Sequence, residues 1–217
     1  MKSTQNQLRI TEIFHSLQGE STTVGLPTVF VRLTGCPLRC QYCDTAYAFS
    51  GGNTKSIDSI IEQVAAFGCR HVCVTGGEPL AQRRCLDLLT CLCDAGYSVS
   101  LETSGALSLA DVDQRVMIVM DLKTPDSGEH GKNKLSNISF LKPSDQIKFV
   151  LCSRNDYEWA CEMINEHQLA NRVQILFSPS WNQLNSTTLA DWIIQDRLFV
   201  RLQLQLHKLL WNDTPGH

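Results

Sequence analysis

Three cysteines within eight positions have the most distinctive chemistry in this sequence: Cys36, Cys40 and Cys43, in the segment TGCPLRCQYCDT (residues 34–45). A structural zinc site requires four ligands in a closed tetrahedron, and a disulfide requires an even number of cysteines and an oxidising compartment. Three thiolates on one short loop instead suit a cubane iron–sulfur cluster in which one iron has no protein ligand. The spacing therefore predicts a cluster with one open iron.

Seven further cysteines are scattered through apolar stretches, where a free cysteine behaves as a small hydrophobic side chain. We expect no cluster ligand among them: Cys69, Cys73, Cys85, Cys91, Cys93, Cys152 and Cys161. The predicted cluster then depends on the three thiols of the loop alone.

Composition and charge are those of a soluble globular chain. Of its 217 residues 43% are hydrophobic and 19% are charged, with a net charge of −3 and a pI of about 6.0. No basic run or basic patch interleaved with aromatic residues stands out, which argues against a nucleic-acid partner. The start, MKSTQNQLRITEIF, lacks the apolar core of a signal peptide, and no run reaches membrane-spanning length. We expect a cytoplasmic protein with no membrane partner and a single domain over residues 1–217.

The rest of the chain must position the cysteine loop, and it alternates strand-like with helix-like stretches. Branched and aromatic residues predict buried strands at residues 28–35, 71–79, 97–105, 117–125, 146–151 and 172–180. Apolar residues at helical spacing predict helices at residues 56–68, 85–92, 155–168 and 187–196. Ser56 is suited to begin the first helix and Gly68 to end it. A final strand is expected at residues 201–208, and residues 49–56 and 124–134 are expected to be flexible surface loops.

This alternation predicts an α/β fold of parallel strands joined by right-handed crossovers. About six βα units are fewer than the eight of a closed barrel, so we expect an open, partial (βα)6-type barrel. Chemistry in barrels collects at the carboxyl ends of strands, where the cysteine loop falls together with TGGEP (75–79), ETSG (102–105), DLKTP (121–125) and FSPSW (177–181). The glycine pair of TGGEP would let backbone approach a ligand closely, and Glu78 behind it would add an acceptor.

The cysteine spacing and the later Gly76-Gly77-Glu78-Pro79 resemble the radical S-adenosylmethionine superfamily. The resemblance implies that the three cysteines hold a [4Fe–4S] cluster. The amino and carboxylate groups of S-adenosylmethionine would then chelate the fourth iron. An aromatic residue at Tyr42 also fits that superfamily.

Longer segments narrow the resemblance: EIFHSLQGES, VFVRLTGCPLRCQYCDT, VTGGEPL, LETSG and QLHK are similar to the 7-carboxy-7-deazaguanine synthase family, across the whole chain. This implies a lyase of queuosine and 7-deazapurine biosynthesis. Such an enzyme converts 6-carboxy-5,6,7,8-tetrahydropterin to 7-carboxy-7-deazaguanine and releases ammonia. The resemblance further implies regeneration of S-adenosylmethionine, assistance by Mg2+, an electron donor such as flavodoxin or ferredoxin, and a homodimer.

The same resemblance implies roles for individual residues. The pterin pocket would be lined by Leu17, Gln18, Gly19, Glu20, Arg32, Thr75 and His207. S-adenosylmethionine would lie along Tyr42, Cys43, Asp44, Gly77, Asp121, Leu122 and Lys123, and Mg2+ would take the hydroxyl of Thr45. One protein ligand is enough for Mg2+, which keeps its waters and binds through substrate anions.

Structural explanations compete for several of these residues. Arg32 would be a surface ion pair on an edge strand, although a charge inside TVFVRLTG is costly to bury unless it meets an anion. Thr45 would cap a turn, Lys123 would be a solvated strand end, and His207 would belong to the core or a dimer interface.

The sequence also departs from the family pattern. Ser21 stands where a glycine is expected after LQGE, and DLKT replaces a Ser-Pro-Lys motif. The tail WNDTPGH extends past the region of similarity. Two other functions stay open on the sequence: a radical enzyme that activates a partner protein, and a zinc or redox module built on the cysteine loop.

The cluster prediction can be tested by mutation. Replacing Cys36, Cys40 or Cys43 with Ala should remove most of the iron and all cleavage of S-adenosylmethionine, because the site has no spare ligand. Iron and sulfide analysis after anaerobic purification provides the measurement. The other seven cysteines should each tolerate the same change, and an iron requirement for Cys73 or Cys93 but not Cys36 would contradict the assignment.

Overall fold

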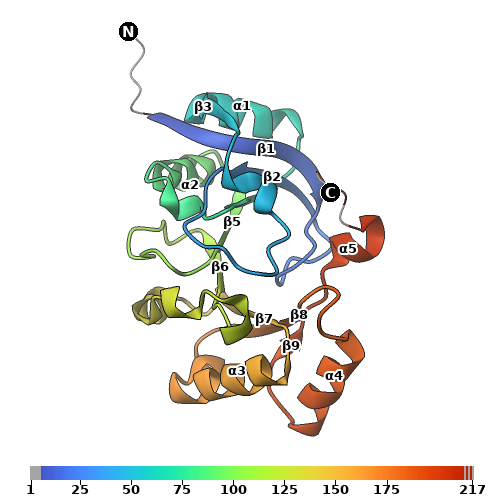
Figure 1. Cartoon of the computed structure of the whole chain (residues 1–217). Coiled ribbons are helices and arrows are strands. Elements are labelled where there is room, and N and C mark those ends of the chain that lie inside the picture. Colours follow the sequence, from blue (N-terminus) through green and yellow to red (C-terminus); the bar gives the residue numbers. More distant parts are fainter. Residues whose placement is uncertain (1–5, 213, 215, 217) are drawn as a thin grey trace.

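The computed structural model describes residues 6–212, 214 and 216. Within them, nine strands form one sheet in the order β3-β1-β2-β4-β5-β6-β7-β8-β9 (Figure 1). The strands are β1 Gln7–Leu17, β2 Pro27–Leu33, β3 Asn53–Ser56, β4 His71–Gly76, β5 Ser98–Thr103, β6 Met117–Asp121, β7 Gln146–Leu151, β8 Gln174–Pro179 and β9 Arg201–Leu202. All neighbours from β2 to β9 are parallel, whereas β1 runs antiparallel to β2 and β3. Since β3 and β9 do not pair in this part of the chain, the prediction of an open, partial barrel is confirmed.

Alternation along the strands gives the sheet two different faces. In β2, Val29, Val31 and Leu33 belong to the hydrophobic core between sheet and helices. The intervening Phe30 and Arg32 instead line a cavity on the inner face. The same alternation in β4 and β5 places apolar side chains outside and polar ones inside.

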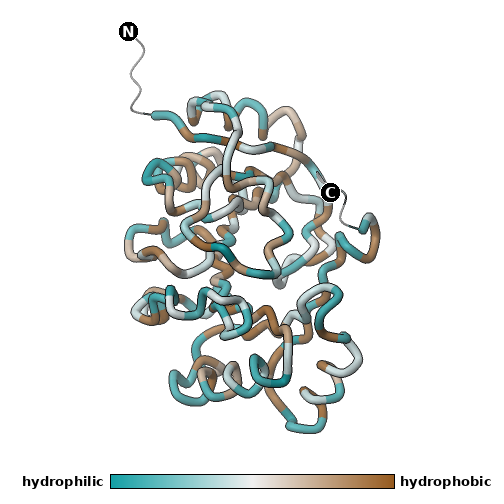
Figure 2. The backbone as a smooth tube through the Cα atoms, viewed as in Figure 1, coloured by the Kyte–Doolittle hydropathy of each residue, from teal (hydrophilic) through white to brown (hydrophobic). Residues whose placement is uncertain are grey.

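The helices are α1 Ile57–Ala66, α2 Cys85–Asp94, α3 Arg154–Glu166, α4 Ser186–Gln195 and α5 Leu206–Trp211. As predicted, the Ser56 hydroxyl caps α1 by accepting the Ser59 N–H, and Gly68 with φ +63° follows its end. Figure 2 shows hydrophobic and hydrophilic residues interspersed along the helices, the pattern of helices with one buried face. No helix of the described residues has both the length and the apolar character needed to cross a membrane.

Several predicted elements are wrong. Strands β1 and β3 were not expected, and β3 occupies the second half of the loop predicted at 49–56. The final strand predicted at 201–208 is only two residues long, and the chain then forms α5. At the start of α5 the N–H of Leu206 donates to the carbonyl of Gly19 at 3.0 Å.

 That hydrogen bond joins two distant parts of the sequence, so the local pattern of residues could not predict the turn into α5.

The crossovers are also less regular than predicted. No α-helix lies between β5 and β6 in the described residues, and the connection from β6 to β7 contains only 3-10 turns. The buried amide of Asn137 replaces helical hydrogen bonds there, because it donates to the carbonyls of Gly105 (2.9 Å) and Leu107 (2.7 Å) and accepts from the Leu109 N–H (3.1 Å). The loop predicted at 124–134 is anchored by the buried residues Thr124 and Ser127.

The loop between β1 and β2, residues 18–26, closes the amino-terminal end of the barrel, and we call it the closing loop. The Thr22 N–H donates to the side chain of Gln146 at the start of β7 (2.9 Å), and the Gln146 amide donates to the Thr22 hydroxyl (2.8 Å). The loop is also held to itself by the Gln18 N–H and Leu26 carbonyl (2.8 Å). These contacts bury Gln18 and Glu20 at the bottom of the cavity.

Ser21 in the closing loop keeps a backbone conformation that favours glycine. Its φ is +67°, in the left-handed region, which explains why a glycine is expected at this position. The Ser21 hydroxyl contacts that of Thr23 at 2.8 Å and accepts the Thr23 N–H at 3.1 Å. These hydrogen bonds offset the strain of a side chain in this conformation.

Substitutions at Ser21 should reverse the usual order of stability. Ser21→Ala keeps the strain and loses the hydrogen bonds, so it should be less stable than Ser21→Gly by about 1 kcal/mol in urea unfolding. Glu162, exposed within α3, is the matched control, where Gly should instead be less stable than Ala by about 1 kcal/mol. The same order at both positions would contradict the strain at Ser21.

Candidate active site

One cavity of about 650 Å3 opens at the carboxyl ends of the strands and gathers nearly all of the predicted site residues. Its lining includes Leu17, Gln18, Gly19, Glu20, Arg32, Cys36, Cys40, Tyr42, Cys43, Asp44, Thr45, Thr75, Gly77, Asp121, Lys123 and His207. Leu122 is the exception. It is buried, and its N–H donates to the Lys148 carbonyl at 2.9 Å.

The cysteine loop follows β2 and is held by backbone contacts on several sides. The Gly35 N–H donates to the carbonyl of Ala48 (2.8 Å) within the loop region. From the connection after β6, Glu129 accepts the Arg39 N–H (2.7 Å) and Ser127 accepts the Gln41 N–H (3.1 Å). The loop that carries the three thiols is therefore fixed to two strand ends.

The glycine pair after β4 allows the backbone to approach the cysteine loop. A Cβ on Gly77 would overlap the Gly35 carbonyl and would lie 2.7 Å from the Cβ of Cys36. One on Gly76 would lie 2.8 Å from the Leu33 nitrogen. The predicted close approach of the backbone is therefore made to the end of β2 and the cysteine loop of the protein itself. Gly77 also lines the cavity.

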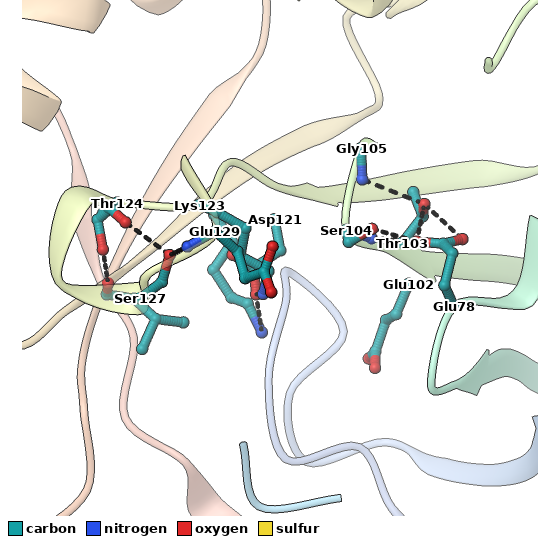
Figure 3. A network of polar contacts seen from close by, with 12 residues as sticks. Glu78, Glu102, Thr103, Ser104, Gly105, Asp121, Lys123, Thr124, Ser127 and Glu129 are labelled. Atoms are coloured by element: carbon teal, nitrogen blue, oxygen red, sulfur yellow. Dashed lines mark hydrogen bonds and ion pairs between the residues drawn. The ribbon is translucent and has the colours of Figure 1, made fainter. Parts of the chain in front are cut away.

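Glu78 ties the ends of β4 and β5 together. Its fully buried carboxylate accepts the N–H groups of Leu80 (3.0 Å) and Ser104 (2.7 Å) and the hydroxyl of Thr103 (2.9 Å). Figure 3 shows Glu78 turned toward Thr103 and Ser104, whereas the carboxylate of Glu102 points away from them. Glu78 is thus a hydrogen-bond acceptor, as expected, but the groups that donate to it belong to the protein and not to a ligand.

The three loop thiols line the cavity together as free cysteines. Burial raises the pKa of Cys36, of Cys40 (to about 11) and of Cys43, while the charge of Lys123 acts in the opposite direction on all three. Thiols with raised pKa values become thiolates by binding metal. Within the described residues no three acidic, cysteine or histidine side chains converge on one ion. A cubane does not need such convergence, since each cysteine binds a different iron, and the three thiols therefore fit it.

A row of polar side chains crosses the inner face below the cysteine loop. Arg32 pairs in register with Glu12 on β1 and with Thr75 on β4. The Arg32 Nε donates to Glu12 at 2.7 Å, and the Thr75 hydroxyl donates to Glu102 at 3.0 Å. Glu102 also accepts the side-chain amide of Gln18 at 3.2 Å.

Arg32 lies between two aromatic rings, 5.7 Å from the centroid of Phe14 and 5.8 Å from that of Tyr47. Burial opposes its charge, but Tyr47 and Glu12 outweigh burial and raise the pKa of the guanidinium. Arg32 does form an ion pair, as one explanation from the sequence held. However, β2 is not an edge strand and Arg32 lines the cavity.

A second charged group lies deeper in the cavity. Lys148 on β7 is 2.6 Å from Glu20 and 3.7 Å from Asp121, and Lys123 is 2.9 Å from Asp121. Burial alone would lower the pKa of Lys148 and Lys123, but the neighbouring carboxylates raise both above the ordinary value. Lys123 is buried, so it is not the solvated strand end that the sequence left open.

The segment around α5 joins the closing loop to the cysteine loop. A Cβ on Gly19 would collide with the His207 ring, which shows how closely the two residues pack. The Lys208 ammonium lies 3.3 Å from Asp44. Burial opposes ionisation of Asp44, but Lys208 and the Thr45 hydroxyl lower its pKa to about 2. His207 lines the cavity, as predicted from the resemblance.

Thr45 presents its hydroxyl to Asp44 rather than to the turn that follows. Its Oγ1 donates to the Asp44 carboxylate at 2.8 Å and caps no backbone N–H of the 3-10 turn Ala46–Phe49. The Thr45 hydroxyl therefore lies at the cavity wall beside a carboxylate, and oxygen atoms of this kind are those that Mg2+ prefers.

Sequence reasoning missed several residues of the cavity and its supports. These are Glu12, Glu102, Lys148, Ser180, Trp181, Gln205 and Lys208. Glu102 and Lys148 carried a readable signal, because each is a charge inside an apolar strand, the same feature that identified Arg32. Trp181 lies in FSPSW and Lys208 in QLHK, two segments that the sequence singled out, but neither residue was given a role of its own.

Comparison with known proteins agrees with the geometry. The Radical SAM superfamily model matches residues 30–166. The chain is 45% identical to the 7-carboxy-7-deazaguanine synthase of Chlorobaculum tepidum over 99% of both chains. It is 43% identical to that of Koribacter versatilis over 96% of this chain and 100% of the relative. The crystal structure of QueE from Escherichia coli superposes with a TM-score of 0.77 and 26% identity, covering 93% of this chain and 95% of the other.

These matches do not favour the protein-activating enzyme or the zinc or redox module. They support a [4Fe–4S] cluster and S-adenosylmethionine as the cofactors. The chain belongs to the 7-carboxy-7-deazaguanine synthase family of the radical S-adenosylmethionine superfamily.

Proposed function

We propose that this chain converts 6-carboxy-5,6,7,8-tetrahydropterin to 7-carboxy-7-deazaguanine with release of ammonia, in queuosine and 7-deazapurine biosynthesis. The observation that carries the proposal is that a single cavity contains both the three-cysteine loop and the polar row of Arg32, Thr75 and Glu102. A radical generated at the cysteine loop would therefore meet a substrate bound on that row. The full-length similarity to synthases of this name supports the same activity.

The cofactors supply the radical chemistry and the protein supplies binding and orientation. When bound, the cluster and S-adenosylmethionine would supply the radical chemistry that removes a hydrogen atom from the substrate. Cys36, Cys40 and Cys43 would hold the cluster. The residues along S-adenosylmethionine would be Tyr42, Cys43, Asp44, Gly77, Asp121 and Lys123, with Leu122 acting only from outside the cavity.

Arg32 is suited to bind the substrate carboxylate. Its Nε is occupied by Glu12 at 2.7 Å, so the two terminal nitrogens of the guanidinium remain for a ligand. A planar guanidinium can bind a carboxylate through two parallel hydrogen bonds. Phe14 and Tyr47 flank the group and restrict its orientation before the substrate arrives.

Water would be kept from the reacting atoms by the closing loop below and α5 at the side. Gln18, Gly19 and Glu20 close the bottom of the cavity, and His207 packs against Gly19. A closed site protects a reactive radical from side reactions.

Further features of the proposal follow from the family resemblance. Mg2+ would bind Thr45 together with substrate oxygens, next to Asp44. Electrons would come from a donor such as flavodoxin or ferredoxin. The working form would be a cytoplasmic homodimer.

The activity can be tested directly with anaerobically reconstituted protein. With S-adenosylmethionine, a reductant and 6-carboxy-5,6,7,8-tetrahydropterin, we expect 7-carboxy-7-deazaguanine and ammonia by mass spectrometry. Deuterium at the abstracted pterin position should appear in recovered S-adenosylmethionine, because the cofactor is regenerated. Stoichiometric methionine and 5′-deoxyadenosine per product would indicate that the cofactor is consumed and would contradict this reaction.

Arg32→Lys should keep the cluster and S-adenosylmethionine binding but lose most pterin turnover. Lysine retains the charge but offers a single point contact on a flexible stem, and a small misplacement of the substrate can cost about 100-fold in rate. Steady-state kinetics give the measurement, with the exposed Arg84 changed to Lys as the matched control. A kcat/KM for Arg32→Lys near that of the wild type would remove Arg32 from the substrate site.

A further inference from the structure

Lys148 holds the closing loop from inside the barrel. It lies two residues after Gln146 on β7, so both side chains point to the same face of the strand. Gln146 contacts Thr22 in the closing loop, and Lys148 contacts Glu20 in the same loop at 2.6 Å. β7 therefore anchors this loop at two successive inward positions.

The same ammonium lies near a carboxylate on the neighbouring strand β6, where Asp121 is the register partner of Lys148. Asp121, at the carboxyl end of β6, is 3.7 Å from the Lys148 Nζ and 2.9 Å from the Lys123 Nζ. The Lys123 Nζ in turn lies 5.6 Å from the ring of Tyr42 in the cysteine loop. Lys148 thus stands between the loop assigned to the pterin and the strand end assigned to S-adenosylmethionine.

One oxygen of this group has no partner. The Oδ1 of Asp121 is buried and makes no hydrogen bond within the described residues, although Asp121 lines the cavity. Leaving a buried carboxylate oxygen unsatisfied is costly. A ligand that donates to this oxygen would fix the Asp121 carboxylate, and with it the neighbouring ammonium of Lys148.

We propose that Lys148 is a positioning residue that couples the two halves of the cavity, so that binding of S-adenosylmethionine and binding of the pterin strengthen each other. The first ligand orders Asp121, Lys148 and Glu20 as one group, and the second ligand binds to a site that is already ordered. This inference rests on the proposed function, because it assumes that both ligands occupy this cavity.

Calorimetric binding to the oxidised, cluster-loaded protein tests the coupling without turnover, because no reductant is present. In the wild type, saturating S-adenosylmethionine should tighten pterin binding by about 5-fold to 150-fold. Reciprocity requires the same factor for S-adenosylmethionine with and without the pterin. Lys148→Met should bring both factors to about 1, and Lys148→Arg should retain part of the coupling because it keeps the charge.

Two further variants separate coupling from a general loss of structure. Glu20→Gln removes one charge partner of Lys148 and should also lose the coupling, which provides a second test if Lys148→Met fails to load iron. Lys132→Met, an exposed lysine outside the cavity lining, should bind as the wild type does. Iron content and the urea midpoint are measured for every variant.

The outcomes distinguish the inference from the proposed function. A wild-type protein that does not bind the pterin would overturn the proposed function and this inference together. A wild type that binds both ligands without coupling, or a Lys148→Met variant that folds, loads iron and keeps the full coupling factor, would overturn the inference alone.

Discussion

The cysteine loop can lie against the end of β4 only because Gly76 and Gly77 have no side chains. Any Cβ on Gly77 would occupy the space of Gly35 and Cys36, so the first cysteine would have to shift from its position. The approach is secured by hydrogen bonds from Gly77 to Leu33 (3.2 Å) and from Glu78 to Gly35 (2.8 Å). The buried Glu78 links this contact to the end of β5, because it accepts hydrogen bonds from Thr103 and Ser104. The ends of β2, β4 and β5 are thereby held together where they line the cavity.

The inner face of this barrel carries many charged and polar side chains among its apolar ones, whereas a closed eight-stranded barrel is filled by branched apolar side chains. Its charges come in pairs from different strands or loops, such as Arg32 with Glu12 and Lys148 with Glu20. Buried ion pairs contribute little net stability because desolvation offsets their attraction. Stability comes instead from the apolar outer face, which packs against the helices, and the inner face is left to bind ligands.

Local signals predicted the parts of the molecule that depend on local sequence. The cysteine spacing, the glycine pair and a charge inside the apolar strand β2 identified the cavity, and capping by Ser56 identified the start of α1. The prediction failed where distant contacts decide the structure. Residues 201–208 alternate like a strand, yet the chain turns into α5 against Gly19. Glu102 and Lys148 are a different case, because each carries the same local signal as Arg32 and was still given no role from the sequence. The roles of individual site residues remain predictions.

The closing loop has a consequence for how the chain acquires its structure during synthesis. Its anchors lie far along the sequence, since Thr22 bonds to a residue 124 positions later and Glu20 to one 128 positions later. Contacts of such separation form late, after the intervening chain has folded. The backbone of the cysteine loop has its partners after β6 no later than residue 129, upstream of β7. The backbone that carries the thiols can therefore be held while the closing loop still lacks its anchors on β7, and the cavity wall supplied by α5 is added after both.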